Sequence, residues 1–248
     1  MSSNSGGGFK ETVSTVIYAV IIALGIRTFA YEPFNIPSGS MIPTLLVGDY
    51  LFVSKLSFGY SRYSLPWSLP LITDRIFFSE PERGDVVVFR LPTNTKVDYI
   101  KRLVGLPGDT IQVIQGVLQI NGKAVVREKT DDYLSTDSLG NVRRTTRYLE
   151  TLPGGRTHYI LESMGDYGSA DNTDVYTVPA GHYFAMGDNR DNSQDSRYLD
   201  VVGFIPRENL IGRANFLFFS IDGVGWNGFE FWKWPGKIRF GRLLNGIE

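Results

Sequence analysis

A serine framed by glycine and two prolines is the first residue in this chain that could do chemistry. Ser40 lies in the stretch IPSGSMIP, residues 36–43. The prolines stiffen this segment, and Gly39 permits unusual dihedral angles and close approach of a substrate backbone. The backbone N–H of Ser40 and the hydroxyl of Ser38 could then act as oxyanion donors. The plainer alternative is that the Ser-Gly-Ser segment forms only a turn or a helix cap.

A serine hydroxyl is a weak nucleophile and needs a base within hydrogen-bond reach. The chain contains only two histidines, His158 and His182, and no cysteine. Both histidines fall in predicted β regions away from the motifs, so a Ser-His triad is not expected. We therefore expect a different base, such as a lysine, if Ser40 is a nucleophile.

Lys101 is well placed for this task. In its predicted strand, alternation puts Val97, Tyr99 and Leu103 on the same face as Lys101, whereas Arg102 falls on the other face. Burial disfavours the ammonium form, and a fully buried lysine can have a pKa of roughly 5–6. A neutral amine could take the serine proton. The alternative is that Lys101 extends out of the sheet into solvent, as most lysines do.

A third motif, GDNRDNSQDSR, occupies residues 187–197. Its many Asx and Ser residues predict a loop packed by its own side-chain hydrogen bonds. A calcium loop is the obvious competitor, but no register offers a glycine at the sixth place with a glutamate at the twelfth. We therefore expect no metal and no cofactor. Asp195 and Arg197 could form an ion pair that holds the loop, with Ser193 facing the site.

The composition is that of an ordinary folded protein, with 42% apolar residues, 27 glycines and 12 prolines. The net charge of −1 argues against a nucleic-acid-binding surface and against disorder. The absence of cysteine excludes disulfides and thiolate metal sites.

The N-terminal region has one long apolar segment. Residues 1–11 are rich in serine and glycine and predict a disordered tail, and residues 12–30 predict a single transmembrane anchor. The uncharged part is short for a span, but Arg27 can extend it by reaching the interface. A buried soluble helix and a cleaved signal peptide are the alternatives. Lys10 and Arg27 flank the apolar run on opposite sides, so charge alone encodes the orientation weakly.

Beyond the anchor the pattern predicts a mostly β, antiparallel fold. Residues 31–126 and 176–225 form the predicted core, and residues 127–175 a β-rich inserted lobe. Residues 226–248 contain an aromatic and cationic cluster that contacts either lipid or one end of the core. A type I′ hairpin is expected at Asn121-Gly122. The predicted strands are 85–90, 97–104, 111–114, 117–120, 124–126, 176–178, 182–186 and 210–221.

Together these segments resemble the bacterial type I signal peptidase (leader peptidase) family. The matching blocks are residues 32–55, 84–92, 98–109 (DYIKRLVGLPGD) and 181–197, in family order. The segment EPFNIPSGSMIPTLLVGD, residues 32–49, resembles the Gram-negative branch of this family. The blocks span most of the chain outside the predicted lobe and the C-terminal segment.

The resemblance implies a membrane-anchored serine endopeptidase with a Ser/Lys dyad, which cleaves exported preproteins at small-x-small sites. Its catalytic domain would lie on the periplasmic side of the inner membrane and its tail in the cytoplasm. The resemblance implies that Ser40 is the nucleophile and Lys101 the general base, with the Ser38 hydroxyl and the Ser40 amide as oxyanion donors. It implies that Ser193 holds the lysine amine and that Asp195 and Arg197 brace the loop. It also implies that Tyr99 lines the site and that Ile36 and Ile100 shape shallow substrate pockets.

The chain departs from familiar members of this family. It has one apolar span where some relatives have two, and five residues separate Arg197 from Gly203, where the family's link is short. Two other functions remain open. One is a specialised Ser/Lys processing peptidase with few substrates, and the other is a membrane-tethered β-domain without catalysis, which requires Ser40 and Lys101 to lie apart. The expected partners are preproteins and the lipid bilayer, without nucleic acid. The sequence does not indicate an oligomeric state.

Overall fold

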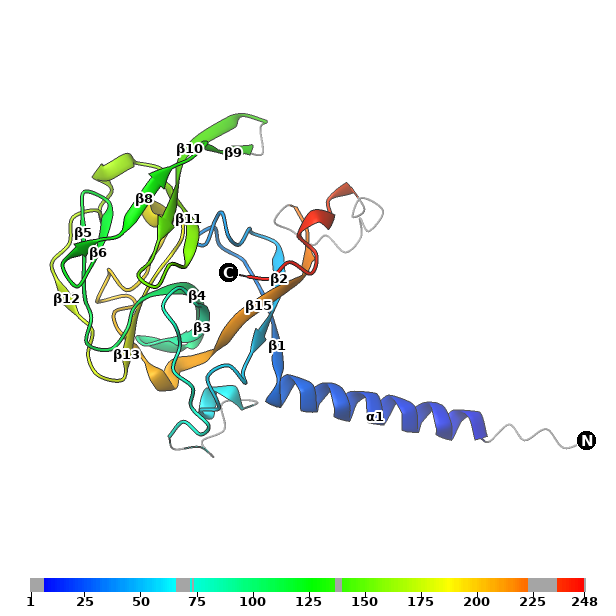
Figure 1. The fold of residues 1–248 in the computed structure, drawn as a ribbon. Helices are drawn as coiled ribbons and strands as arrows, with labels where there is room; N and C mark the ends of the chain where they lie inside the picture. The colour runs from blue at the N-terminus through cyan, green and yellow to red at the C-terminus, as the bar shows by residue number, and fades with distance from the viewer. Residues whose placement is uncertain (1–6, 66–71, 73, 137–139, 223–235, 248) are drawn as a thin grey trace, which may run out of the picture.

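A computed structural model describes residues 7–65, 72, 74–136, 140–222 and 236–247 of the chain. Figure 1 shows one long N-terminal helix that extends away from a body of β-strands. This arrangement confirms the predicted mostly β, antiparallel fold with one apolar N-terminal helix.

Helix α1 spans Gly7–Phe29 and therefore begins inside the segment predicted as a tail. Its apolar part, Lys10–Phe29, has a mean hydropathy of 1.8 and is not buried against the rest of the protein. A helix of 23 residues is about 35 Å long, enough to cross the hydrocarbon core of a bilayer. The alternative of a core helix finds no support, because this segment is not buried and its described ring contact, Phe29 with Tyr60, lies at its C-terminal end.

The largest sheet has seven strands in the order β1-β2-β15-β3-β4-β13-β14, with antiparallel pairing throughout. β1 and β14 are its edge strands. The strands are β1 (Tyr31–Asn35), β2 (Asp49–Ser54), β3 (Val86–Leu91), β4 (Asn94–Gly105), β13 (His182–Met186), β14 (Ile205–Pro206) and β15 (Leu210–Ser220).

A second sheet has the order β12-β5-β6-β7. Its strands are β5 (Thr110–Ile114), β6 (Val117–Ile120), β7 (Lys123–Ala124) and β12 (Tyr176–Thr177). The turn between β6 and β7 places Asn121 at φ 54° and Gly122 at φ 72°. Two consecutive positive φ angles are what a type I′ turn requires, which confirms the predicted hairpin.

A third sheet is built from β8 (Val126–Lys129), β10 (Val142–Thr151) and β11 (Thr157–Glu162), and β9 (Tyr133–Thr136) pairs with one end of β10. We call these four strands the lobe strands. The sequence analysis identified this region as β-rich without locating its strands. The short 3₁₀ helices are η1 (Arg62–Ser64), η3 (Gly165–Tyr167), η4 (Arg190–Asn192), η5 (Arg207–Asn209) and η7 (Phe240–Arg242).

Three apolar clusters fill the interior. The first packs the loop between β1 and β2, through Met41 and Leu45, against Val53 and Val86. The second packs Leu103 and Tyr183 on the other side of the main sheet, and the third joins the second sheet to β13. The serine loop and β4 are therefore both fixed by core packing, so their relative position is well determined.

Each strand predicted from the sequence has a counterpart within a few residues of its expected position. β1 and β2 were not predicted. The domain boundaries stay predictions. The aromatic cluster of the C-terminal segment falls on residues 226–234, which lie outside the described residues.

Candidate active site

Ser40 lies in the loop that joins β1 to β2, and the base of this loop is fixed by backbone hydrogen bonds. The Ile36 N–H donates to the Asp49 carbonyl at 2.8 Å, and the Gly48 N–H donates to the Ile36 carbonyl at 3.0 Å. Met41, the residue after the serine, is fully buried in the first apolar cluster. The Ser40 side chain is 92% buried, which leaves it accessible only from one side.

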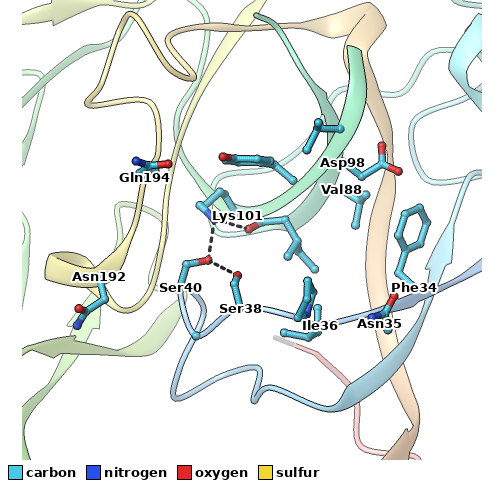
Figure 2. A pocket seen from close by; sticks show the side chains of 15 residues that line it. Phe34, Asn35, Ile36, Ser38, Ser40, Val88, Asp98, Lys101, Asn192 and Gln194 are labelled. Atoms are coloured by element: carbon cyan, nitrogen blue, oxygen red, sulfur yellow. Dashed lines mark hydrogen bonds between the residues drawn. The ribbon is translucent and has the colours of Figure 1, made fainter. Parts of the chain in front are cut away.

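Lys101 lies on β4 and approaches the serine directly. Its Nζ donates to Ser40 Oγ at 2.7 Å and to the Ile100 carbonyl at 3.0 Å, as Figure 2 shows. The amine also lies 5.1 Å from the centre of the Tyr99 ring. A membrane-tethered β-domain without catalysis would require Ser40 and Lys101 to lie apart. The 2.7 Å separation of Ser40 Oγ and Lys101 Nζ argues against that alternative.

Lys101 is 96% buried, and no carboxylate of a described residue lies within ion-pair distance of its amine. Burial lowers the pKa of Lys101 to about 8, although the more distant charges of Asp195 and Asp188 act in the opposite direction. A substantial fraction of the amine is therefore neutral near pH 8.

Two groups beside Ser40 could stabilise an oxyanion. The Ser38 hydroxyl lies 3.4 Å from Ser40 Oγ and is exposed to the groove. The backbone N–H of Ser40 has no acceptor among the described residues. The Ser40 N–H is therefore free for a ligand, and the Ser38 hydroxyl, whose one described contact is the long one to Ser40 Oγ, could turn toward the same ligand.

A groove of about 610 Å³ opens in front of Ser40. Its walls come from β1, from the serine loop and from the part of β4 that precedes Lys101. Tyr99, Ile36 and Ile100 all line it, and their roles toward a substrate stay predictions. The other lining side chains labelled in Figure 2 include Phe34, Val88, Asn192 and Gln194.

The loop 187–197 lies directly against the serine loop. Asp195 and Arg197 form an ion pair with two hydrogen bonds of 2.9 Å, and both side chains are buried. A side chain at Gly187 would put its Cβ 2.2 Å from Ser193 Oγ and 2.5 Å from the Ser40 carbonyl oxygen. Only glycine therefore permits this close approach of the two loops.

The sequence predicts that Ser193 holds the Lys101 amine, but no hydrogen bond joins these two side chains. Ser193 Oγ is buried and has no hydrogen-bond partner in the described structure. The amine donates instead to Ser40 and to a carbonyl of its own strand. The hydroxyl nevertheless lies beside Gly187 and the Ser40 carbonyl, so its role in the site stays a prediction.

Asn189 was not singled out by the sequence analysis, yet it contacts the serine loop twice. Its backbone N–H donates to the Ser40 carbonyl at 3.1 Å, and its side-chain amide donates to the Gly39 carbonyl at 2.9 Å. The dense Asx motif was the available signal, but the sequence does not show which of its members reaches another loop.

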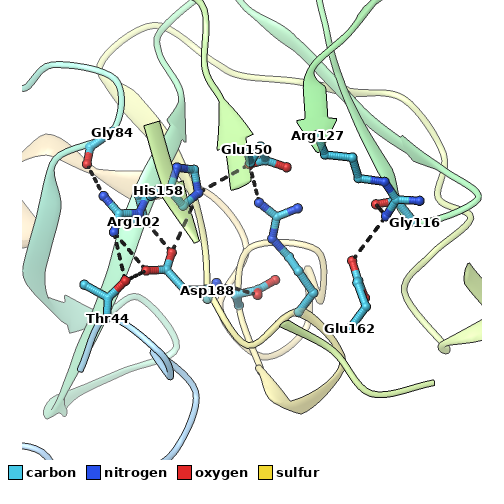
Figure 3. A network of polar contacts seen from close by, with 12 residues as sticks. Thr44, Gly84, Arg102, Gly116, Arg127, Glu150, His158, Glu162 and Asp188 are labelled. Carbon is cyan, nitrogen blue, oxygen red and sulfur yellow. Dashed lines mark hydrogen bonds and ion pairs between the residues drawn. The ribbon is translucent and has the colours of Figure 1, made fainter. Parts of the chain in front are cut away.

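A network of buried charges lies behind the site (Figure 3). Arg102 donates to both oxygens of Asp188 at 2.9 and 2.8 Å and to the Gly84 carbonyl at 2.8 Å. Thr44, in the serine loop, donates to the same carboxylate at 2.5 Å. The Arg102–Asp188 pair therefore connects β4, the loop 187–197 and the serine loop.

The network continues toward the lobe strands. His158 on β11 lies 3.3 Å from Glu150 and 3.9 Å from Asp188, and Glu150 accepts from Arg190 at 2.5 Å. Arg190 lowers the pKa of Glu150 to about 2 against the opposing effect of burial. His158 thus belongs to a buried polar network that reaches the motif 187–197 through Asp188, which corrects the expectation that both histidines lie away from the motifs.

A carboxylate cluster that could hold a metal ion lies outside the groove, at Glu162, Asp171 and Asp191. Asp191 belongs to the loop 187–197, and the other two residues lie outside every motif identified from the sequence.

Comparison with known proteins identifies the family of the chain. The family model of signal peptidases, peptidase S26, matches residues 9–219. The signal peptidase I of Rickettsia conorii is 41% identical, and that of Rickettsia akari 44% identical, each over 99% of this chain and 96% of the relative.

A solved structure of a signal peptidase I from Enterococcus faecalis shares 31% sequence identity and covers 54% of this chain and 97% of its own, with a TM-score of 0.31. That TM-score is too low to support a conclusion about the fold, whereas the sequence relatives cover nearly the whole chain. The chain therefore belongs to the signal peptidase family of S26 peptidases, which confirms the bacterial, Gram-negative family and the serine endopeptidase class predicted from its motifs.

Proposed function

We propose that this protein is a membrane-anchored endopeptidase that removes N-terminal signal peptides from exported preproteins by means of a Ser40/Lys101 dyad. The observation that carries the proposal is the 2.7 Å contact between Ser40 Oγ and a buried amine without a paired carboxylate. The relatives named signal peptidase I supply the substrate class.

In the first step the neutral amine of Lys101 takes the proton of the Ser40 hydroxyl, and Oγ attacks the carbonyl carbon of the scissile bond. Negative charge develops on the carbonyl oxygen. The Ser40 N–H donates to it, and the Ser38 hydroxyl turns from Ser40 Oγ to donate as well. Removal of one such donor costs about 10²–10³ in rate in well-studied hydrolases.

In the second half the protonated Lys101 gives its proton to the leaving amine, which departs as the new N-terminus of the mature protein. The signal peptide remains as an ester on Ser40. A water molecule then gives a proton to Lys101 and attacks the ester, which releases the signal peptide and restores both side chains.

The sheet supports binding of an extended substrate. β13 pairs with β4 only from Arg102 to Gly105, so the edge of β4 before Lys101 has no described partner strand on that side. β1 is likewise an edge strand of the sheet. A peptide could add its backbone to such an edge and place alternate side chains in pockets.

The same groove supports a preference for small residues at the first and third positions before the cut. Ile36 is 97% buried and Ile100 is half-buried, so both present fixed apolar walls close to Ser40. Overfilling a packed apolar pocket generally costs about 1–3 kcal/mol. We expect alanine at these positions to be accepted and large side chains to be rejected.

A half-exposed aromatic face supports placement against a lipid surface. Tyr31, Phe52 and Phe216 pack with ring-centre distances of 5.3–6.3 Å on β1, β2 and β15. α1 runs almost directly into β1, so this face begins where the apolar helix ends. Aromatic rings of this kind suit the interface of a bilayer. We propose that the catalytic domain lies on the periplasmic side of the inner membrane.

Cleavage of a preprotein by the purified full-length protein in detergent tests the proposal. The substrate carries alanine at the first and third positions before the cut, and a matched substrate carries leucine at the first. We expect cleavage of the alanine substrate at that bond alone, little cleavage of the leucine substrate, and no cleavage by Ser40→Ala or Lys101→Ala.

Circular dichroism of both variants serves as the folding control. Substantial turnover by either folded variant would refute the dyad. Failure of the wild-type protein to cleave several unrelated preproteins would instead favour a specialised processing peptidase.

A further inference from the structure

Three carboxylates from distant parts of the sequence meet at the loop 187–197, and one of them belongs to this loop. Glu162 ends β11, Asp171 follows η3, and Asp191 lies in η4. One oxygen of each lies within 4.8 Å of the others. Calcium binds carboxylate oxygens at 2.3–2.6 Å, so ligand oxygens on opposite sides of one ion can be about 5 Å apart. The three oxygens are therefore close enough to share an ion.

The surrounding arginines make their closest contacts with other acids. Arg197 is paired with Asp195, and Arg190 with Glu150. Arg127 makes its short contact, 2.7 Å, with Asp166 and approaches Glu162 only to 3.7 Å. Among the described residues, the three carboxylates therefore have one ion-pair contact within 4 Å, although the more distant charges of Arg190 and Arg197 partly offset them. Close approach of like charges is unfavourable unless a cation or a proton compensates it.

Glu162 points to a missing partner. Its side chain is 1% exposed, and neither carboxylate oxygen has a hydrogen-bond partner in the described structure. A buried carboxylate without hydrogen bonds is costly, and buried charges in proteins are normally paired or bound to a metal.

The other two carboxylates are already oriented. Asp171 Oδ2 accepts from the Gly168 N–H at 2.5 Å, and Asp191 Oδ2 accepts from the Met164 N–H at 2.7 Å. A Cβ at Gly168 would lie 2.1 Å from Asp191 Oδ1 and 2.9 Å from Asp171 Oδ2. The absence of a side chain at Gly168 therefore lets the two acids approach each other, while hydrogen bonds hold one oxygen of each.

We propose that Glu162, Asp171 and Asp191 bind one calcium ion, which ties the lobe strands to the loop that carries Ser193. Oxygen ligands alone, in an irregular arrangement, suit calcium better than zinc or the strictly octahedral magnesium ion. The sequence argument against calcium concerned the loop 187–197 alone. This site takes only one ligand from that loop, so no loop motif for calcium is required.

The test uses the full-length protein in a neutral detergent after removal of divalent ions with EGTA. Isothermal titration with calcium chloride should show one ion per chain, and the melting temperature should rise by about 3–8 °C at saturating calcium. Sodium chloride at equal ionic strength should not reproduce the rise, and magnesium chloride should reproduce it only weakly.

Glu162→Gln and Asp171→Asn should each abolish the calcium-dependent part of the melting temperature. The matched control is Asp174→Asn, an exposed acid close to Asp171 and outside the cluster, which should keep the full rise. Glu162→Gln can raise the melting temperature without calcium, because it removes a buried charge, so the readout is the difference with and without calcium.

Absence of binding by the wild-type protein would overturn the proposal, as would an undiminished rise in both cluster variants. If the variants fold poorly, the number of calcium ions bound per wild-type chain decides whether the proposal stands. The same titration on Ser40→Ala should match the wild type, because the site is separate from the dyad, so its outcome does not depend on the proposed cleavage chemistry.

Discussion

Lys101 and Arg102 are neighbours on β4 and are both buried, yet their surroundings are opposite. Lys101 faces the groove and donates to a hydroxyl and a carbonyl. Arg102 faces the inner network and donates to both oxygens of Asp188. Among the described residues, Lys101 thus has no paired carboxylate, whereas Arg102 is paired with Asp188.

The comparison shows that burial alone does not decide what a charged side chain does. A compensated guanidinium stays charged and holds three segments together. An uncompensated amine loses part of its preference for the charged form, and its pKa moves to about 8, where it can exchange a proton. The same strand therefore carries a reactive group on one face and a structural one on the other.

The largest expected effect is on cleavage by Lys101→Met. Methionine keeps the length and apolar character of the side chain but cannot accept a proton, so we expect cleavage to fall by about 10²–10⁴-fold or more. The melting temperature should stay the same or rise, because no paired carboxylate is left behind. Lys96→Met, an exposed lysine on the same strand, is the control and should keep full activity. A large loss of stability in Lys101→Met would break the contrast with Arg102.

Arg102→Met should show the reverse pattern, with stability lost first. It leaves the buried Asp188 carboxylate without its partner, which typically costs about 3–5 kcal/mol of unfolding free energy. Chemical denaturation of the two single variants and of the double variant Arg102→Met/Asp188→Asn measures the coupling. We expect the double variant to recover part of the loss, and additive losses would contradict the pairing.

The pH dependence of kcat/KM should report the Lys101 amine. Because the amine must be neutral to act as a base and its pKa is about 8, the rate should fall about tenfold per unit below that pH and level off above it. Peptide cleavage between pH 6 and 10, with circular dichroism at each pH as the folding control, tests this. A flat profile between pH 6 and 8 would mean that Lys101 is not the proton acceptor.

The smallest predicted effect concerns Asn189→Ala. It removes the side-chain hydrogen bond to Gly39 but keeps the backbone bond to Ser40, so we expect kcat/KM to fall about 2–10-fold. Asn209→Ala is the matched control, because its amide also donates to a backbone carbonyl at 2.9 Å, that of Arg90, outside the groove. Equal losses in both variants would indicate a general effect on stability.

Local patterns predicted most strands of this fold. Alternation in β4 and the Asn121-Gly122 turn depend on neighbouring residues, which a sequence displays directly. β1 was missed because Pro33 lies inside it, and proline is a weak strand signal that is tolerated at a sheet edge. β8 and β10 are polar and largely exposed or half-exposed, so their strand positions carry little hydrophobic signal, whereas β11 carries the buried apolar pair Ile160 and Leu161.

Contacts between distant segments were harder to predict. The expected hold of Ser193 on Lys101 is absent, whereas Asn189, its neighbour in the same motif, reaches the serine loop. The members of a dense polar loop have similar local preferences, so only the packing of the loop selects the residue that makes each contact.

The sequence by itself determined that a serine lies in a stiff glycine-containing loop and that a lysine shares a strand face with apolar residues. It also determined the apolar N-terminal segment and the family motifs. The tertiary structure decided that Ser40 and Lys101, 61 positions apart, lie 2.7 Å from each other. It also decided that Arg102 receives a carboxylate and Lys101 does not. The physical reason is that alternation sets which way a side chain points, whereas sheet pairing and core packing set what it meets.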